Sequence, residues 1–216
     1  MAASRVLKPV PPVTPSSRKA SRALAQAIPK RADGILLGDS LAAGWPAMML
    51  TGPHSGHSVF NYGVPGERIQ NTLWRLDALD TSHLRPGWVV VLLGTNNLGD
   101  GDLPGEIASG LERVIEATSR LWHAPHHVVL TIPPRGIPRF READRQTANE
   151  LLAERYMMES RFTLLDTDSA LGRSLNDGSA FESDHLHINQ SGYALLSIAV
   201  NRVLHGAGDE GPNRRS

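Results

Sequence analysis

Residues 88–93 read Trp88-Val-Val-Val-Leu-Leu93, an apolar run in which polar and apolar side chains do not alternate. β-Branched and aromatic residues favour strands, and a strand without alternation is buried on both of its faces. Strands of this kind occur in parallel sheets that helices cover on both sides. The run therefore predicts the buried interior of such a sheet.

Shorter apolar runs and helical patterns alternate on either side of this strand. Four further strands are predicted, at residues 34–38, 58–62, 127–132 and 161–166. Helices are predicted to open at Ser40, to span residues 67–79, 106–122 and about 141–157, and to follow a cap at Asn189, after a polar loop at 167–188. Helical crossovers of this length join parallel strands, so the expected fold is α/β, a three-layer α/β/α sandwich with a five-stranded parallel sheet.

Composition limits the class of protein. The chain has 216 residues, 22 basic and 22 acidic side chains, and no cysteine. Without cysteine, disulfides, thiolate zinc sites, iron–sulfur clusters and a cysteine nucleophile are excluded. We find no apolar stretch long enough for a transmembrane helix and no apolar core of a secretory signal, and we therefore expect a cytoplasmic protein.

Charge and proline content divide the chain into one domain with two tails. Residues 1–32 carry seven of the basic side chains and no acidic one. Because this segment is also rich in proline and serine, we expect a mobile tail without helix or strand at least as far as Arg18. An organelle transit peptide, an electrostatic contact and a solvated extension all remain open for it. The domain is expected at 33–205, followed by a disordered tail at 206–216.

Three polar blocks follow three of the predicted strands. They are Gly38-Asp39-Ser40-Leu41, Asn61-Tyr-Gly-Val-Pro-Gly66 and Gly94-Thr-Asn-Asn97. Each block alone is also what a simple turn or helix cap requires. In open α/β sheets, however, ligands bind outside the carboxyl ends of the strands, where these blocks meet.

Together the blocks supply the parts of an acyl-transfer site. Ser40, at a helix N-terminus, is the candidate nucleophile, and it requires a histidine base that a carboxylate orients. In Asp184-His185-Leu186-His187, the spacing lets Asp184 and His187 meet through one imidazole nitrogen. The backbone N–H groups of Ser40 and Gly66 and the side-chain amide of Asn96 are the candidate oxyanion donors.

Several alternatives stay open at this point. His185 is a rival base, since spacing does not choose between it and His187. Asp39 is interpreted as a brace for the turn rather than as a triad member. Arg135 either holds a polar substrate group or is a solvated side chain. Histidine clusters at 123–127 and 185–187 fit capping or surface roles better than a metal site, and we predict no metal and no cofactor.

The four ordered blocks resemble the GDSL or SGNH hydrolase family over roughly residues 34–204. On this resemblance, Ser40 corresponds to the nucleophile, Gly66 and Asn96 to the oxyanion glycine and asparagine, and Asp184 and His187 to the Asp-x-x-His pair. The family spacing thus selects His187 over His185. The resemblance implies the flavodoxin-like sheet of the family and a serine esterase.

Finer similarity is to the branch of platelet-activating-factor acetylhydrolase catalytic subunits and carbohydrate acetylesterases. Gly94-Thr-Asn-Asn97 and Thr131-Ile-Pro-Pro-Arg-Gly136 carry this similarity. It implies short acyl groups, chiefly acetyl, on a small-molecule ester of a sugar or lipid. A lysophospholipase, an acyl thioesterase and a non-catalytic glycan- or lipid-binding domain are the alternatives. We expect no nucleic-acid partner for the domain, and the oligomeric state stays open.

Overall fold

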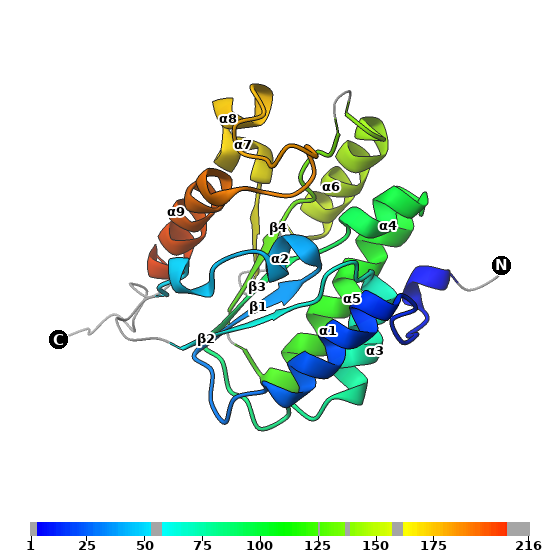
Figure 1. Cartoon of the computed structure of the whole chain (residues 1–216), viewed down its shortest axis with the longest axis vertical. Helices are drawn as coiled ribbons and strands as arrows, with labels where there is room; N and C mark the ends of the chain where they lie inside the picture. Colours follow the sequence, from blue (N-terminus) through cyan, green and yellow to red (C-terminus); the bar gives the residue numbers. More distant parts are fainter. Residues whose placement is uncertain (1–3, 53–57, 125, 137–138, 157–161, 207–216) are drawn as a thin grey trace.

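The computed structural model describes residues 4–52, 58–124, 126–136, 139–156 and 162–206. All five strands are parallel and form one sheet in the order β2-β1-β3-β4-β5 (Figure 1). Their bounds are β1 Gly34–Gly38, β2 Val59–Gly63, β3 Trp88–Leu92, β4 His126–Leu130 and β5 Phe162–Leu165. The predicted α/β class with a five-stranded parallel sheet is confirmed.

β3 lies in the middle of the sheet, between β1 and β4. Val89 and Val91 pack into the core on one side, and Val90 and Leu92 pack into the core on the other. Successive side chains of a strand point to opposite faces, so a strand covered on both sides has to be apolar at every position. This explains the unalternated run in the sequence.

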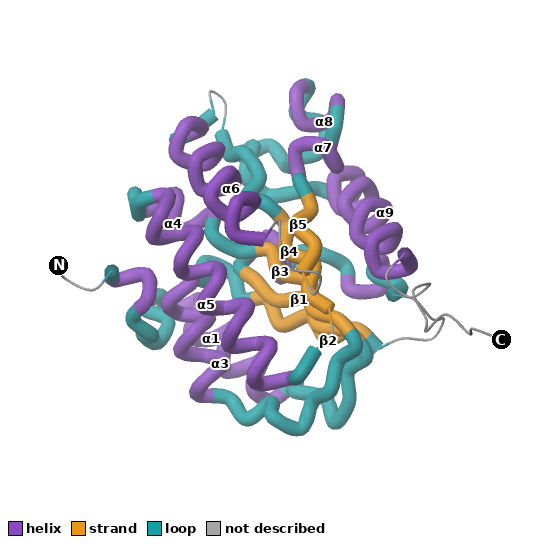
Figure 2. The backbone as a smooth tube through the Cα atoms, turned by 180° about the vertical axis from the view of Figure 1, so that it is seen from behind, coloured by secondary structure: helices purple, strands orange, loops and turns teal. Residues whose placement is uncertain are grey.

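Helices cover both faces of the sheet (Figure 2). The longer helices are α1 Pro15–Gln26, α3 Ile69–Ala78, α5 Pro104–Trp122, α6 Glu142–Tyr156 and α9 Gln190–Gly206. The shorter ones are α2 Ser40–Ala43, α4 Thr95–Asp100, α7 Thr167–Leu171, α8 Arg173–Asn176 and the 3₁₀ turns η1 Arg5–Leu7 and η2 Ala47–Met49. α3, α5 and α6 build the core of one face, whereas α2, α7 and α9 build the core of the other.

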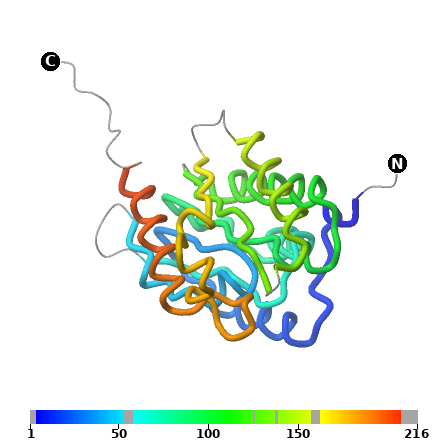
Figure 3. The backbone as a smooth tube through the Cα atoms, turned by 90° about the horizontal axis from the view of Figure 1, so that it is seen from above, coloured from blue at the N-terminus to red at the C-terminus, as the bar shows by residue number. Residues whose placement is uncertain are grey.

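The N-terminal segment differs from the predicted mobile tail. A helix, α1, begins at Pro15, so the prediction that the chain forms no helix as far as Arg18 is wrong. Proline is tolerated in the first turn, where its missing N–H has no partner to lose, and Thr14 caps the helix by accepting the Ser17 N–H. Val6 is fully buried in the core that α3 and α5 share. Figure 3 shows this blue segment and the red C-terminal helix on opposite sides of the molecule.

Two further differences concern short elements. The polar loop predicted at 167–188 contains α7 and α8, because Asp166 caps α7 by accepting the Asp168 N–H. α4 was not predicted from the sequence. The disordered tail predicted at 206–216 lies outside the described residues, except for Gly206, which is the last residue of α9. Within the described ranges, no helix is long and apolar enough to cross a membrane.

Candidate active site

Ser40 is the first residue of α2, directly after β1. Asp39 caps this helix through a hydrogen bond of 3.0 Å from the Leu41 N–H to its Oδ1, which agrees with its interpretation as a brace for the turn. A Cβ at Gly38 would lie 1.8 Å from the Leu92 carbonyl oxygen, so only glycine fits at this end of β1. α2 has just four residues, so free N–H groups rather than a long helix dipole supply its positive end.

Ser40, His187 and Asp184 form a continuous hydrogen-bonded chain. The Ser40 Oγ lies 3.1 Å from His187 Nε2, and His187 Nδ1 lies 2.6 Å from Asp184 Oδ2. A carboxylate accepts and cannot donate, so Nδ1 carries the ring proton and Nε2 is left to accept the serine hydroxyl. The chain joins residues 147 positions apart in the sequence.

Asp184 is held ionised in this arrangement. The hydrogen bond with His187 and the backbone N–H groups of His187 and Leu186 lower the pKa of the Asp184 carboxyl to about 2. The two N–H groups lie 2.9 and 3.0 Å from its Oδ1. This leaves the other oxygen directed at the imidazole, and the carboxylate therefore orients the ring at neutral pH.

Helix α9 fixes the position of the His187 loop. Asn189 caps α9 by accepting the Gly192 N–H at 3.0 Å, and its own amide donates to the Ser179 and Phe181 carbonyls at 2.8 and 2.9 Å. The predicted cap is therefore confirmed. One asparagine thus ties the loop that carries His187 to the start of a long, buried helix.

His185 does not face Ser40. It has a left-handed backbone, with φ of +51°, and it lines a separate cavity of about 230 Å³ together with Phe181 and Arg139. Its Nδ1 is buried without a hydrogen-bond partner among the described residues. His187 instead lines a groove of about 440 Å³ with Ser40. Of the two candidate bases, only His187 contacts the serine.

Gly66 and Asn96 come together at the same edge of the sheet. Gly66 lies in the turn after β2 with φ of +73°, a conformation that glycine adopts without strain. Asn96, in the first turn of α4, donates from Nδ2 to the Glu67 carbonyl at 2.9 Å. An amide nitrogen has two hydrogens, so the second remains available to a ligand. The bond ties the two candidate oxyanion loops to each other.

A buried ion pair under the Gly66 turn was missed by the sequence analysis. The side chains of Glu67 and Arg75 are both 0% exposed. Arg75 donates to the two Glu67 carboxylate oxygens at 2.8 and 2.7 Å and to the Tyr62 carbonyl at 3.0 Å. The Thr72 hydroxyl donates to Glu67 as well, at 2.8 Å. A charged residue beside the glycine turn and an arginine on the next helix were the only signals of this pair in the sequence.

Asp39 is the second buried acid near the site. Burial raises the pKa of its carboxyl to about 7, and the negative charge of Glu67 adds to the rise. The Leu41 N–H and the nearby His187 act in the opposite direction. The residue before the candidate nucleophile therefore titrates near neutral pH.

The Arg135 side chain packs against α4. Its guanidinium donates to the Thr95 carbonyl at 2.7 Å and lies over the ring of Phe140, 5.6 Å from its centroid. A Cβ at Gly99 would come within 2.3 Å of the guanidinium, so the arginine fills the space that this glycine leaves on α4. Arg135 thus supports the helix that carries Asn96.

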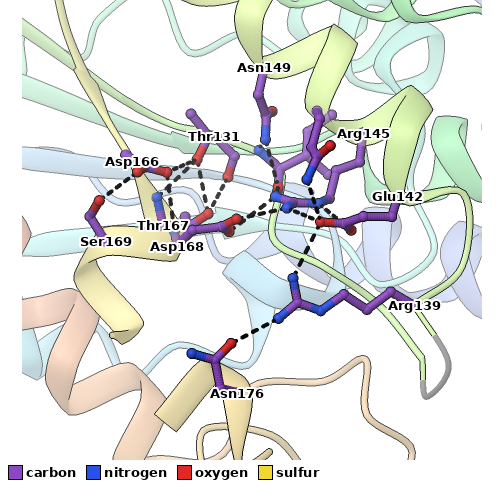
Figure 4. Close-up of polar contacts among 12 residues, drawn as sticks. Thr131, Arg139, Glu142, Arg145, Asn149, Asp166, Thr167, Asp168, Ser169 and Asn176 are labelled. Atoms are coloured by element: carbon purple, nitrogen blue, oxygen red, sulfur yellow. Dashed lines mark hydrogen bonds and ion pairs between the residues drawn. The ribbon is translucent and has the colours of Figure 1, made fainter. Parts of the chain in front are cut away.

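An ion-pair cluster holds the ends of β4 and β5 (Figure 4). Arg145, whose side chain is 1% exposed, bonds Glu142 at 2.6 Å, Asp168 at 2.7 Å and the Ile132 carbonyl at 2.8 Å. The Thr131 and Thr167 hydroxyls are 2.9 Å apart beside it. These contacts connect α6 and α7 at the edge of the sheet where the candidate site lies.

The other candidate histidines serve the fold. His127 is 1% exposed and its Nε2 lies 3.0 Å from the Thr118 hydroxyl, which joins β4 to α5. His123 ends α5 in a left-handed conformation. His123 thus fits the predicted capping role, whereas the buried His127 differs from the predicted surface role because it packs between β4 and α5.

Comparisons with known proteins agree with this architecture. A model of the GDSL-like lipase/acylhydrolase family matches residues 36–195. The human platelet-activating factor acetylhydrolase IB subunit alpha1 is 32% identical over 149 residues, which cover 67% of this chain and 62% of that subunit. The matched stretch thus spans less than two thirds of the length of this relative.

Solved structures share the fold. A lipase/acylhydrolase from Enterococcus faecalis superposes with a TM-score of 0.65 at 21% identity, over 81% of this chain and 96% of that one. A catalytic mutant of an acetylxylan esterase from Geobacillus stearothermophilus gives 0.62 at 18% identity, over 80% and 94%. With the family match over most of the sheet and its loops, the chain belongs to the GDSL-like lipase/acylhydrolase family.

Proposed function

We propose that the protein is a serine esterase with Ser40 as nucleophile, His187 as general base and Asp184 as the residue that orients the imidazole. One observation carries the proposal: the hydrogen-bonded chain from the Ser40 hydroxyl through both imidazole nitrogens to the Asp184 carboxylate. A serine hydroxyl is a weak nucleophile until a base takes its proton, and this geometry supplies that base.

The reaction follows from the positions of these groups. Ser40 Oγ attacks the acyl carbonyl carbon while its proton passes to His187 Nε2, and Asp184 stabilises the imidazolium that results. The tetrahedral intermediate then collapses, its alcohol leaves with the proton from His187, and an acyl-enzyme remains. Water attacks this acyl group with His187 again as base, and the acid and free Ser40 are released.

Three donors are proposed to stabilise the charged oxygen of the intermediate: the Ser40 N–H, the Gly66 N–H and the Asn96 side-chain amide. The hydrogen bond from Asn96 to the Glu67 carbonyl supports this role, since it fixes the amide beside the Gly66 turn. Removing one donor of an oxyanion hole typically lowers kcat about 10²- to 10³-fold.

The proposed substrate is a short-chain, chiefly acetyl, ester of a sugar or a lipid. The acetyl preference is supported by the stretches after β3 and β4, residues 94–97 and 131–136, which resemble those of the acetylhydrolase and acetylesterase branch. It is also supported by similar proteins whose names refer to acetylhydrolase and acetylxylan esterase activities. Residues that line the groove beside Ser40 are Gly44, Pro46, Glu182, His187, Ile188, Gln190 and Tyr193.

A fluorophosphonate probe tests the esterase directly. We expect the probe to label the wild-type protein and the Ser119→Ala control, whose changed residue lies on α5 across the sheet, and not Ser40→Ala. Labelling of Ser40→Ala would show that another residue reacts with the probe and would reject Ser40 as the nucleophile. Folded wild-type protein that is never labelled would favour the non-catalytic binding domain.

A series of aryl esters from acetyl to dodecanoyl tests the acyl group. Acetylated xylose, an acyl thioester and a lysophospholipid extend the series to the alternative substrates. We expect kcat/KM to be highest for acetyl and to fall with chain length. A rise with chain length would reject the acetyl preference and would leave the esterase mechanism in place.

A further inference from the structure

The N-terminal segment lies against the Gly66 turn and the start of α3. The Val10 N–H donates to the Gln70 carbonyl at 3.1 Å, and the Asn71 side chain donates to the Val10 carbonyl at 3.1 Å. Arg5 pairs with the nearly buried Asp102 at 2.6 Å. The segment is therefore attached to the first turn of α3, which follows the Gly66 turn, and to the loop after α4.

Ser17, on α1, reaches the turn itself. It is 2% exposed, and its hydroxyl donates to the Pro65 carbonyl at 2.9 Å. The Thr14 hydroxyl lies 2.7 Å from the Ser17 oxygen. Because the single Ser17 proton is used on Pro65, Thr14 is the donor in that second bond. Two hydroxyls thus form a short chain that ends on the Pro65 carbonyl.

This carbonyl and the Gly66 N–H belong to one peptide unit. A peptide group is planar and trans, so its C=O and N–H point in opposite directions and turn together. A hydrogen bond that holds the Pro65 oxygen on the side of α1 therefore directs the Gly66 N–H away from α1. The same bond polarises the peptide and strengthens its N–H as a donor.

Gly66 leaves room for this contact. With φ of +73°, its missing Cβ would lie 3.2 Å from the Ser17 Oγ, and among the described residues no other heavy atom outside its immediate neighbours comes within contact distance of that point. Ser17 therefore lies directly over the open side of the glycine. A side chain is strained at this positive φ, so the turn has glycine here. The polar contact at this position comes instead from Ser17 on α1.

We propose that Ser17 is a positioning residue that orients the Gly66 N–H toward the developing oxyanion, so that the N-terminal segment is part of the catalytic apparatus. The proposal rests on the proposed esterase function. It assigns a role to a segment that precedes the residues matched by the family model.

The test compares Ser17→Ala with Ser17→Thr, which keeps the hydroxyl, and with Ser21→Ala. Ser21 is a matched control, since it lies on the same helix and is also buried, at 7% exposure. For each full-length variant, kcat and KM for a short aryl ester, the inhibition constant of a trifluoromethyl ketone and the melting temperature are measured. The ketone forms a tetrahedral adduct whose oxygen reports the oxyanion donors.

We expect Ser17→Ala to lower kcat about 5- to 20-fold and to weaken the ketone by a similar factor, with KM changed less than about twofold, because one hydrogen bond behind the donor is lost. Ser17→Thr should recover most of the loss, and Ser21→Ala should match the wild type. Equal losses in Ser17→Ala and Ser21→Ala, or losses that follow the melting temperature alone, would overturn the proposal.

The outcome separates this proposal from the esterase itself. Wild-type turnover that Ser40→Ala abolishes, together with an unimpaired Ser17→Ala variant, rejects the role of Ser17 and leaves the esterase standing. Absence of any turnover that depends on Ser40 rejects both.

Discussion

The Tyr193 hydroxyl donates a 2.8 Å hydrogen bond to the Leu41 carbonyl, and this bond joins α9 to the short helix that carries Ser40. Trp45 adds a second link, since its Nε1 donates to the Ser197 hydroxyl at 2.9 Å and its ring stacks on Tyr193. His187 lies just before α9, so these contacts determine how far its imidazole stands from the Ser40 hydroxyl.

Replacing Tyr193 with phenylalanine should therefore affect stability and turnover together. We expect Tyr193→Phe to lower the free energy of unfolding by about 1 kcal/mol, the usual contribution of one such bond, and to lower kcat several-fold. Urea unfolding and ester kinetics measure both. Unchanged stability together with an unchanged kcat in Tyr193→Phe would contradict this prediction.

Asp184→Asn should remove most of the activity while the protein stays folded. An amide that donates to Nδ1 would favour the wrong imidazole tautomer, and we expect kcat to fall by about 10²- to 10⁴-fold. Asp177→Asn, in the same loop, should keep wild-type kinetics. A fall of less than about threefold in Asp184→Asn would show that Asp184 does not orient the base.

Asp184→Asn should also change how much stability the folded protein loses as the pH falls. The pKa of Asp184 is lowered to about 2, so its ionised form stabilises the folded state above the ordinary carboxyl range, and this contribution is lost as pH falls toward 2. The wild type should therefore lose more stability between pH 4 and pH 2 than Asp184→Asn does. Identical acid profiles of the two proteins would contradict this prediction.

Removing only one partner of the buried Glu67–Arg75 pair should strongly destabilise the protein. Arg75→Met leaves the Glu67 carboxylate buried without its cation, and we expect a loss of about 3 to 5 kcal/mol in the free energy of unfolding. The double variant Glu67→Gln/Arg75→Met removes both charges and should recover part of it. Urea unfolding of the two single variants and the double variant gives the coupling energy, and additive losses would rule out a specific pair.

Asp39 should make the folded protein less stable as pH rises toward neutrality. Its pKa is raised to about 7, so between the ordinary carboxyl pKa and 7 the folded state binds a proton that the unfolded state has released. Stability then falls with rising pH over this window, by at most about 4 kcal/mol. The difference between Asp39→Asn and the wild type, followed by urea unfolding from pH 4 to 8, should grow in favour of the variant. A difference that is constant with pH would contradict the raised pKa.

The sequence was sufficient to predict the five-stranded sheet and the polar side chains that follow its strands at the candidate site. Trp88-Val-Val-Val-Leu-Leu93 predicts a central strand because burial on both faces leaves no position for a polar side chain. The polar blocks around Ser40, Gly66 and Asn96 follow strand ends, and parallel strands bring such ends to one edge. Local pattern and topology thus predicted the neighbourhood of the site without coordinates.

Long-range contacts decided what local pattern could not. Local pattern left His185 and His187 equivalent, and only the family spacing selected His187. In the structure the loop before α9 is anchored by Asn189 to a carbonyl 10 positions away, and Tyr193 joins α9 to Leu41, 152 positions away. The Glu67–Arg75 pair and the bond from Ser17 to Pro65 likewise depend on the packing of one element on another. Proline content suggested a tail before Arg18, whereas burial of Val6 and a cap at Thr14 hold this segment against the domain. Sequence alone therefore determined the five strands, the longer helices between them and the polar side chains at the sheet edge, because each of these follows from a local pattern of apolar and polar residues. Tertiary packing decided the N-terminal helix and the orientation of the side chains at the site.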